Sequence, residues 1–144
     1  MNKLWKSAWV IGGSTGLGAE LVRQLTSAGI DTHVSARNEE RLNEHCDKFP
    51  AAKAYPLDIT DEAACVRAVA DINKLKNALP DLIILNAAVY SPMDTENFNA
   101  TEISSMINVN YMGIVNMFAA LLPYKKSGKR VTIAAVTSPS GWRG

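Results

Sequence analysis

Near its N-terminus the chain reads VIGGSTGLG (residues 10–18), a glycine-dense turn that follows the apolar run Ala8–Ile11. A helical pattern follows at once, and five apolar residues fall on one expected face: Leu17, Leu21, Val22, Leu25 and Ala28. A strand, a tight glycine turn and a helix in this order are typical of a dinucleotide-binding loop, because glycines let the backbone approach a diphosphate closely. The helix N-terminus adds unpaired N–H donors. A tight turn that holds no ligand would show the same local pattern.

Composition limits the class of protein. A length of 144 residues, with 47% apolar and 20% charged residues, fits one globular domain spanning 1–144. The formal net charge of +1 gives no electrostatic reason to expect binding to polyanions. No uninterrupted apolar run approaches the ~20 residues that a membrane-spanning helix needs, and the basic segment at 125–130 is too small for a nucleic-acid surface. We therefore expect neither a nucleic acid nor a membrane as a partner.

The cysteines and histidines receive structural interpretations. Cys46 and Cys65 lie at apolar positions of expected helices and are interpreted as buried free thiols, which favours a cytoplasmic location. Because neither cysteine has a CxxC partner or a histidine at ligand spacing, we predict no metal site. His33 falls inside an expected strand and is interpreted as a sheet histidine, whereas His45 is placed on the exposed side of a helix.

Strand and helix patterns alternate along the whole chain. Strands are expected at 8–11, 32–36, 52–57, 82–85 and 131–136, with helices between them and the longest helix at 101–122. Asn38, Thr60 and Asn99 are the predicted N-caps, and Gly29 ends the first helix. This alternation predicts a Rossmann-type α/β fold, a doubly wound parallel sheet of about five strands in the order 3-2-1-4-5, within a three-layer α/β/α arrangement.

Polar residues gather where the expected strands end. The glycine turn follows the first strand, and polar residues follow the other four: Arg37, Asp58, Asn86 and Thr137-Ser138. In an open parallel sheet, ligands bind beyond the carboxyl ends of the strands, at the point where the strand order reverses. Each of these residues alone fits a turn or a cap. Together they favour one shared site.

Asn110 interrupts the apolar face of the long helix. The apolar stripe consists of Ile103, Ile107, Ile114, Met117 and Leu121, and Asn110 fills the gap inside it. An amide buried on such a face is costly unless it is hydrogen-bonded. Asn110 is therefore either a structural asparagine satisfied by nearby backbone or an amide that holds a water or a side chain at a reaction centre.

Five segments match a known set of motifs. Gly12–Gly18 matches the loop Gly-x-x-x-Gly-x-Gly, and Asp58-Ile59-Thr60 is similar to Asp-Val-Thr after a third strand. Leu85–Ala88 stands where Asn-Asn-Ala-Gly is found, Val109–Gly113 resembles Val-Asn-x-x-Gly, and Ser138–Gly141 resembles Ser-x-x-Gly. In this order, and over nearly the whole chain, these segments resemble the short-chain dehydrogenase/reductase family.

The resemblance implies an oxidoreductase that transfers hydride between a nicotinamide dinucleotide and a small-molecule carbonyl or alcohol substrate. It implies a set of cofactor-binding residues: Gly12, Ser14, Thr15, Gly16, Leu17, Gly18, Arg37, Asp58, Ile59, Asn86, Ala87 and Ala88. It also implies two catalytic residues, because Ser138 would polarise the substrate carbonyl and Asn110 would position a water in a proton relay. Members of the family commonly form homodimers through the helix that corresponds to residues 101–122.

Arg37 bears on the choice of dinucleotide. A carboxylate at the end of the second strand binds ribose hydroxyls, whereas a basic residue there accommodates a 2′-phosphate. The segment reads SARN (residues 35–38) and contains no acid. Arg37 therefore favours NADP(H) over NAD(H), with Ser14 as a second phosphate contact. The alternative is a solvent-facing arginine near Glu39 or Glu40.

Three departures from the family pattern matter. Ile11 replaces a threonine whose hydroxyl would tie the glycine loop to the fourth strand, and Leu85 and Ala88 replace an asparagine and a glycine. The family's Tyr-x-x-x-Lys pair, which supplies the proton, is not reached before Gly144. We expect the cofactor half of a longer reductase, truncated before that helix and inactive alone. The alternative is an NAD(P)-binding module or a degenerate, non-catalytic paralogue.

Overall fold

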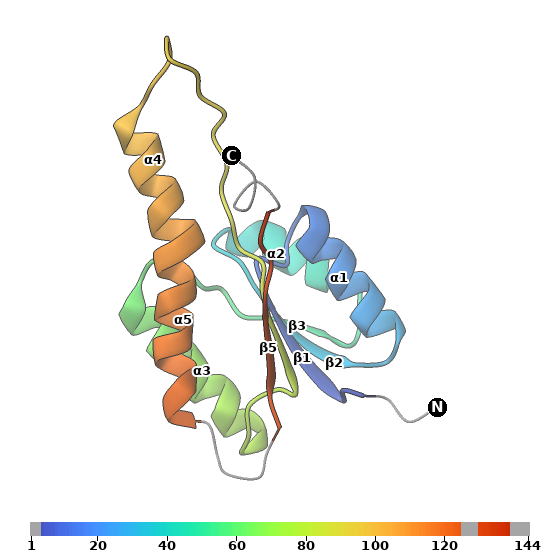
Figure 1. Cartoon of the computed structure of the whole chain (residues 1–144). Coiled ribbons are helices and arrows are strands. Elements are labelled where there is room, and N and C mark those ends of the chain that lie inside the picture. Colours follow the sequence, from blue (N-terminus) through green and yellow to red (C-terminus); the bar gives the residue numbers. More distant parts are fainter. Residues whose placement is uncertain (1–3, 125–129, 139–144) are drawn as a thin grey trace.

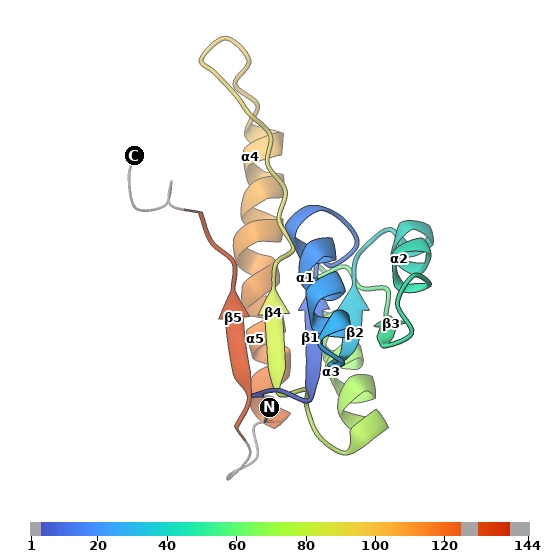
Figure 2. The ribbon, with the colours of Figure 1, turned by 90° about the vertical axis from the view of Figure 1, so that its right-hand side faces the viewer.

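The computed structural model describes residues 4–124 and 130–138, which form a parallel sheet between two helical layers (Figure 1). The strands are β1 (Ser7–Ile11), β2 (Asp31–Ser35), β3 (Ala52–Ala54), β4 (Leu82–Leu85) and β5 (Thr132–Ala135). The helices are α1 (Gly16–Ser27), α2 (Glu39–Cys46), α3 (Glu62–Lys76), α4 (Ala100–Ile107) and α5 (Gly113–Leu121). The strand order is β3-β2-β1-β4-β5 and every pairing is parallel, which confirms the predicted fold (Figure 2).

Each face of the sheet carries its own apolar core. On one face, Val10 and Val34 pack with Val22 of α1 and Leu42 of α2. On the other face, Trp9 belongs to the larger cluster that α3 and α5 cover. Strands that are buried on both faces read as continuous apolar runs, as β1 and β4 do. Cys46 and Cys65 are buried free thiols, as predicted, and burial raises the pKa of each to about 11.

The structure confirms the predicted helix ends except for one N-cap. Asn38 and Asn99 cap α2 and α4, and Gly29 follows α1 with a φ of 69°, all as predicted. The predicted cap Thr60 is wrong, because Asp61 accepts the hydrogen bond from the Ala64 amide and begins α3. Thr60 instead donates from its amide and its hydroxyl to the carboxylate of Asp58.

The histidines differ from one another in burial. His33 is buried within β2, as expected. His45 is not on an exposed side, because its ring is partly buried and packs edge-on against Phe49, with centroids 5.3 Å apart. Burial lowers the pKa of His45, and the nearby charge of Lys48 acts in the same direction.

The long helix does not keep one regular phase. Residues Asn108–Met112 form a π-helical segment between α4 and α5, and each π turn rotates the following residues relative to an ideal α-helix. The predicted stripe is therefore wrong in its first half. Ile107 is 55% exposed and Asn110 is exposed, whereas Val109, Met117 and Leu121 are buried.

The helical stretch Ala100–Tyr124 is long and apolar enough to cross a membrane by length and composition alone, with a mean hydropathy of 1.3 over 18 residues. It qualifies although the sequence has no uninterrupted apolar run of that length, because Ser104, Asn108 and Asn110 are averaged with apolar neighbours. Within the fold, α5 packs against α3 on the sheet. The α5 part of the stretch thus covers the sheet, whereas α4 has no buried residue.

Candidate functional site

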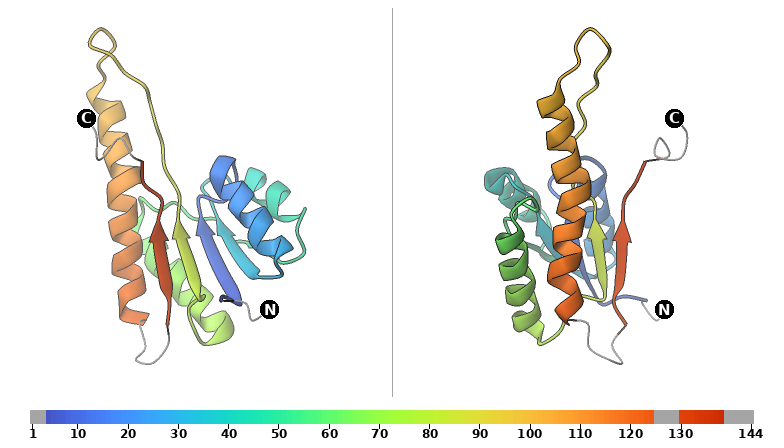
Figure 3. Two further views of the ribbon diagram at one scale, coloured as in Figure 1. Left: turned by 45° about the vertical axis from the view of Figure 1, so that its right-hand side comes forward. Right: turned by 60° about the vertical axis from the view of Figure 1, so that its left-hand side comes forward.

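A cleft of about 310 Å³ opens at the carboxyl ends of the central strands, lined by the segments after β1, β2 and β4. Figure 3 shows the strands of the sheet side by side. The cleft lies at the point where the strand order reverses between β1 and β4. Eight predicted cofactor residues line it: Gly12, Ser14, Thr15, Arg37, Ile59, Asn86, Ala87 and Ala88. The other four predicted cofactor residues are not part of the cleft wall: Gly16, Leu17, Gly18 and Asp58.

The glycine turn is shaped by two left-handed residues. Gly12 has a φ of 85° and lies against the backbone of Ala87, so a side chain at this position would overlap the segment after β4. Gly16 has a φ of 55°, and a Cβ built there would meet nothing within 4 Å. The backbone at Gly16 therefore faces open space at the start of α1. This is the kind of bare backbone that a diphosphate needs.

The start of α1 differs from the starts of α2, α3 and α4. Asn38, Asp61 and Asn99 each cap a helix through a side-chain oxygen, whereas Thr15 at the start of α1 makes no side-chain cap hydrogen bond. The first N–H groups of a helix need partners from outside the helix. A bound anion supplies such partners and is favoured by the partial positive charge of the helix end.

Asn86 ties the glycine turn to β4. Its backbone N–H donates to the carbonyl of Ile11 (2.9 Å), and its side-chain Nδ2 donates to the carbonyl of Gly12 (2.8 Å). Gly18 packs against the same place, because a Cβ there would overlap the Gly12 carbonyl oxygen. The family threonine that Ile11 replaces is thus not needed to connect turn and strand, since the asparagine side chain makes that connection.

Two guanidinium groups lie beside the end of β2. Arg37 and Arg41 both line the cleft. Within 4–124 and 130–138, neither forms a salt bridge, including with Glu39 or Glu40. Arg41, in the first turn of α2, is a lining residue that the sequence pattern did not predict. Two uncompensated cations in one cleft favour an anionic ligand group.

The segment after β3 supplies an apolar wall. Leu57 and Ile59 are buried and line the cleft, together with Val109 of the π-helical segment. Asp58 lies between them, and its Oδ1 accepts two hydrogen bonds from Thr60, at 2.9 Å and 2.8 Å. One carboxylate oxygen of Asp58 therefore shapes the turn itself. Its predicted part in binding the cofactor stays a prediction.

The two predicted catalytic residues lie away from the cleft wall. The Oδ1 of Asn110 accepts from the Val89 amide and its Nδ2 donates to the Val89 carbonyl, both at 2.8 Å. Asn110 thus holds the segment after β4 to the long helix, which agrees with the first of its two interpretations, a structural asparagine satisfied by nearby backbone. Ser138 is exposed beyond β5, and the rest of its motif, residues 139–141, lies outside the described residues.

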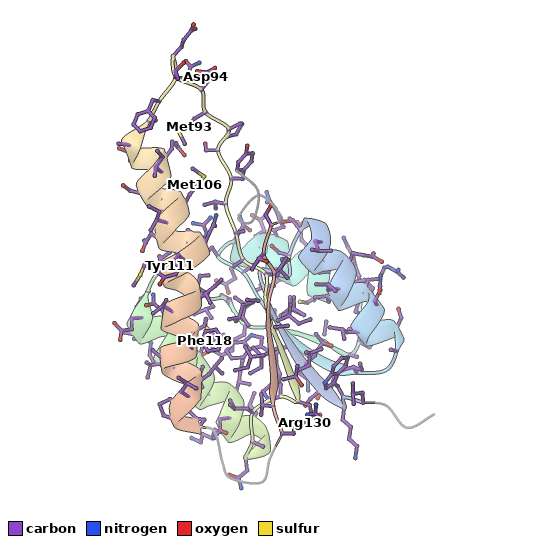
Figure 4. The ribbon with its side chains drawn as sticks, viewed as in Figure 1. Met93, Asp94, Met106, Tyr111, Phe118 and Arg130 are labelled. Atoms are coloured by element: carbon purple, nitrogen blue, oxygen red, sulfur yellow. The ribbon has the colours of Figure 1, made fainter. Side chains whose placement is uncertain are left out.

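The segment that Asn110 holds extends beyond the strands. Met93 and Asp94 lie at its far tip, and Met106 of α4 faces it from the helix (Figure 4). The Ser91 amide donates to the Met106 sulfur at 3.5 Å, which provides a second tether between segment and helix.

Leu17 is 58% exposed at the rim of the glycine turn, so its predicted position on the apolar face of α1 is wrong.

The fold and the cleft define the class of dinucleotide-binding α/β proteins, with the glycine turn, the bare helix end and the strand switch point in one place. The sequence model described as short chain dehydrogenase matches residues 6–144. This chain therefore belongs to the short-chain dehydrogenase family of oxidoreductases.

Known relatives extend well beyond the matched part. The chain is 28% identical over 143 residues to oxidoreductase BOA17 of Botryotinia fuckeliana, covering 98% of this chain and 51% of that protein. It is 31% identical over 155 residues to dehydrogenase/reductase SDR family member 7 of Mus musculus, covering 93% and 44%. The chain thus spans about half the length of these curated relatives.

Solved structures share the fold. The RhlG/NADP active-site complex of Pseudomonas aeruginosa superimposes with a TM-score of 0.84 at 22% identity, covering 94% of this chain and 56% of that one. At this level of identity the similarity concerns the fold.

Proposed function

We propose that this chain binds NADP(H) in the cleft and forms the cofactor-binding part of an oxidoreductase that acts on a small-molecule carbonyl or alcohol. The observation that carries the proposal is the start of α1, where Thr15 lines the cleft without capping the helix and the backbone of the left-handed Gly16 beside it faces open space. Membership of the short-chain dehydrogenase family supports the same assignment. When bound, a nicotinamide dinucleotide supplies the hydride.

Each part of the cleft suits one part of the dinucleotide. The backbone of Ser14 and Thr15 in the cleft wall, with that of the neighbouring Gly16, would hold the diphosphate. The wall of Leu57 and Ile59 would hold the adenine ring. The guanidinium groups of Arg37 and Arg41 would take the 2′-phosphate of NADP(H). RhlG, which shares the fold, is known as an NADP complex, and this supports the preference.

Two residues of this chain are proposed to act at the substrate carbonyl, where the hydride is transferred. We assign to Ser138 the polarisation of the substrate carbonyl, because a hydroxyl donor stabilises negative charge that develops on that oxygen. Asn110 holds Val89, and through it the segment that borders the cleft. Its part in a proton relay is proposed on the family resemblance.

The direct test is equilibrium binding of NADPH, followed by calorimetry and by the fluorescence of the reduced nicotinamide. We expect one saturable site with a dissociation constant of about 1 μM to 1 mM, the usual range of Michaelis constants. Adenosine 2′,5′-bisphosphate, which carries the same 2′-phosphate, should compete with NADPH for this site. Absence of saturable NADPH binding at millimolar concentration, with a folded protein by circular dichroism, would contradict the proposal.

We further propose that two copies pair through the outer face of the long helix. Tyr111, Val115 and Leu122 lie on one side of it, with Tyr111 66% and Leu122 59% exposed. Apolar side chains in a contiguous exposed stripe are typical of interfaces. The homodimers of the family, which use the corresponding helix, support the proposal.

Val115→Lys should convert the dimer to a monomer, because it places a charge at the centre of an apolar contact whose desolvation is not compensated. Sedimentation equilibrium would report the change in mass. Leu75→Lys is the matched control, since Leu75 is an exposed apolar residue of α3, outside this face. A monomeric wild-type chain, or equal effects of both variants, would refute the assignment of this face.

A further inference from the structure

Helix α5 is locked to the segment after β3 at one point. The Nδ2 of Asn116 donates to the carbonyl oxygen of Ile59 at 2.9 Å, across 57 positions of sequence. One turn earlier, Gly113 is buried against the Ile59 side chain, and a Cβ there would overlap it. The helix therefore approaches this segment as closely as backbone allows, and the hydrogen bond fixes their relative position.

The Ile59 carbonyl has little else to hold it. Its other partner is the thiol of Cys65, at 3.6 Å, which is a weak donor. Ile59 lies within the turn that the Asp58 carboxylate closes onto Thr60, and that turn makes no further connection to the long helix among the hydrogen bonds of the described residues. Without Asn116, this part-buried carbonyl would lose the one strong donor that the described part of the chain gives it.

Ile59 is also part of the cleft wall. It is 4% exposed, lines the cleft beside Leu57, and is the residue that Gly113 touches. Its position thus sets the width of the apolar end of the cleft. A small shift of this segment would change the surface offered to a flat aromatic ring, whereas the glycine turn, tied by Asn86, would keep its place.

We propose that Asn116, with Gly113, is a positioning residue for nucleotide binding, which acts by holding Ile59 against the adenine end of the cleft. The inference rests on the proposed dinucleotide site. Asn116 and Gly113 do not line the cleft, so they would act on the ligand only through Ile59.

The test compares Asn116→Leu with Asn108→Leu. Both substitutions replace an asparagine of the same helical stretch with a similar-sized apolar residue, but Asn108 is exposed and its side chain makes no hydrogen bond among the described residues. Affinity for 5′-AMP and for NADPH is measured by calorimetry. Asn116→Leu should weaken 5′-AMP binding about 3- to 10-fold, the effect of one lost hydrogen bond, and Asn108→Leu should leave it within twofold of wild type.

Hydrogen–deuterium exchange separates positioning from general destabilisation. In Asn116→Leu, exchange at residues 58–61 should rise selectively, with residues 12–18 unchanged. Uniform acceleration across the chain, or wild-type affinity for 5′-AMP, would overturn the inference while leaving the proposed function intact. Failure of the wild-type protein to bind NADPH would remove the proposed function instead. If the leucine variant is insoluble, Asn116→Ser provides the same measurements, since its shorter side chain does not reach the Ile59 carbonyl.

Discussion

Gly16→Ala should abolish most NADPH binding while leaving a folded protein. The alanine Cβ meets no atom within 4 Å, so the substitution causes no clash in the protein itself. It does place a side chain on the exposed backbone at the start of α1, next to Thr15 of the cleft wall, at a φ of 55° that alanine adopts reluctantly. Loss of a single hydrogen bond to a charged phosphate weakens binding about 10- to 150-fold, and we expect at least that.

Gly29→Ala is the matched control for Gly16→Ala. Gly29 has a φ of 69°, also left-handed, but follows the far end of α1, away from the cleft. Both variants should lose about 1–2 kcal/mol of unfolding free energy, measured by urea denaturation. Only Gly16→Ala should lose affinity in calorimetric titration. Equal affinities of the two variants would show that the start of α1 does not bind the diphosphate.

The second large effect concerns the two arginines. Arg37→Ala should weaken NADPH binding about 10- to 100-fold and NADH binding less than about threefold, because only NADPH carries the 2′-phosphate that a charge-assisted hydrogen bond would hold. Arg41→Ala should act in the same direction, and the double variant should bind both cofactors with similar affinity. Parallel titrations with NADPH and NADH give the ratio directly.

Arg23→Ala controls for the loss of a positive charge in general. Arg23 pairs with Glu20 on the exposed side of α1 and does not line the cleft. It should leave the NADPH-to-NADH ratio unchanged. Equal losses for the two cofactors in Arg37→Ala would remove the argument for NADP(H). High salt should reduce the selectivity of the wild type, since it screens exposed charges.

Local patterns were sufficient for the frame of this site. The glycine turn, the caps Asn38 and Asn99, and Asn86 at the end of β4 could be placed from residue types and spacing. The cap of α3 could not be, because Thr60 and Asp61 are adjacent residues that can each accept a helix amide, and only the bonds of Thr60 to Asp58 leave Asp61 as the cap.

The contacts that individual side chains make could not be predicted from residue spacing in the same way. Asn110 was placed on a buried stripe by a period of 3.6 residues, but the π-helical segment at Asn108–Met112 breaks that period. Its amide therefore reaches Val89 rather than the core. Arg41 was overlooked because an exposed helical arginine looks the same in sequence whether or not a cleft lies beside it.

The amino-acid sequence alone was enough to establish the parallel α/β frame and the glycine turn, because these follow from periodicity and from the backbone angles that particular residues allow; the strand order followed from the Rossmann-type fold that this frame predicts. Folding in three dimensions decided the contacts across long sequence separations. The bond from Asn86 to Gly12 spans 74 positions and that from Asn116 to Ile59 spans 57. Such pairs depend on how closely a helix or strand approaches its neighbour, a distance that close packing of the whole core sets.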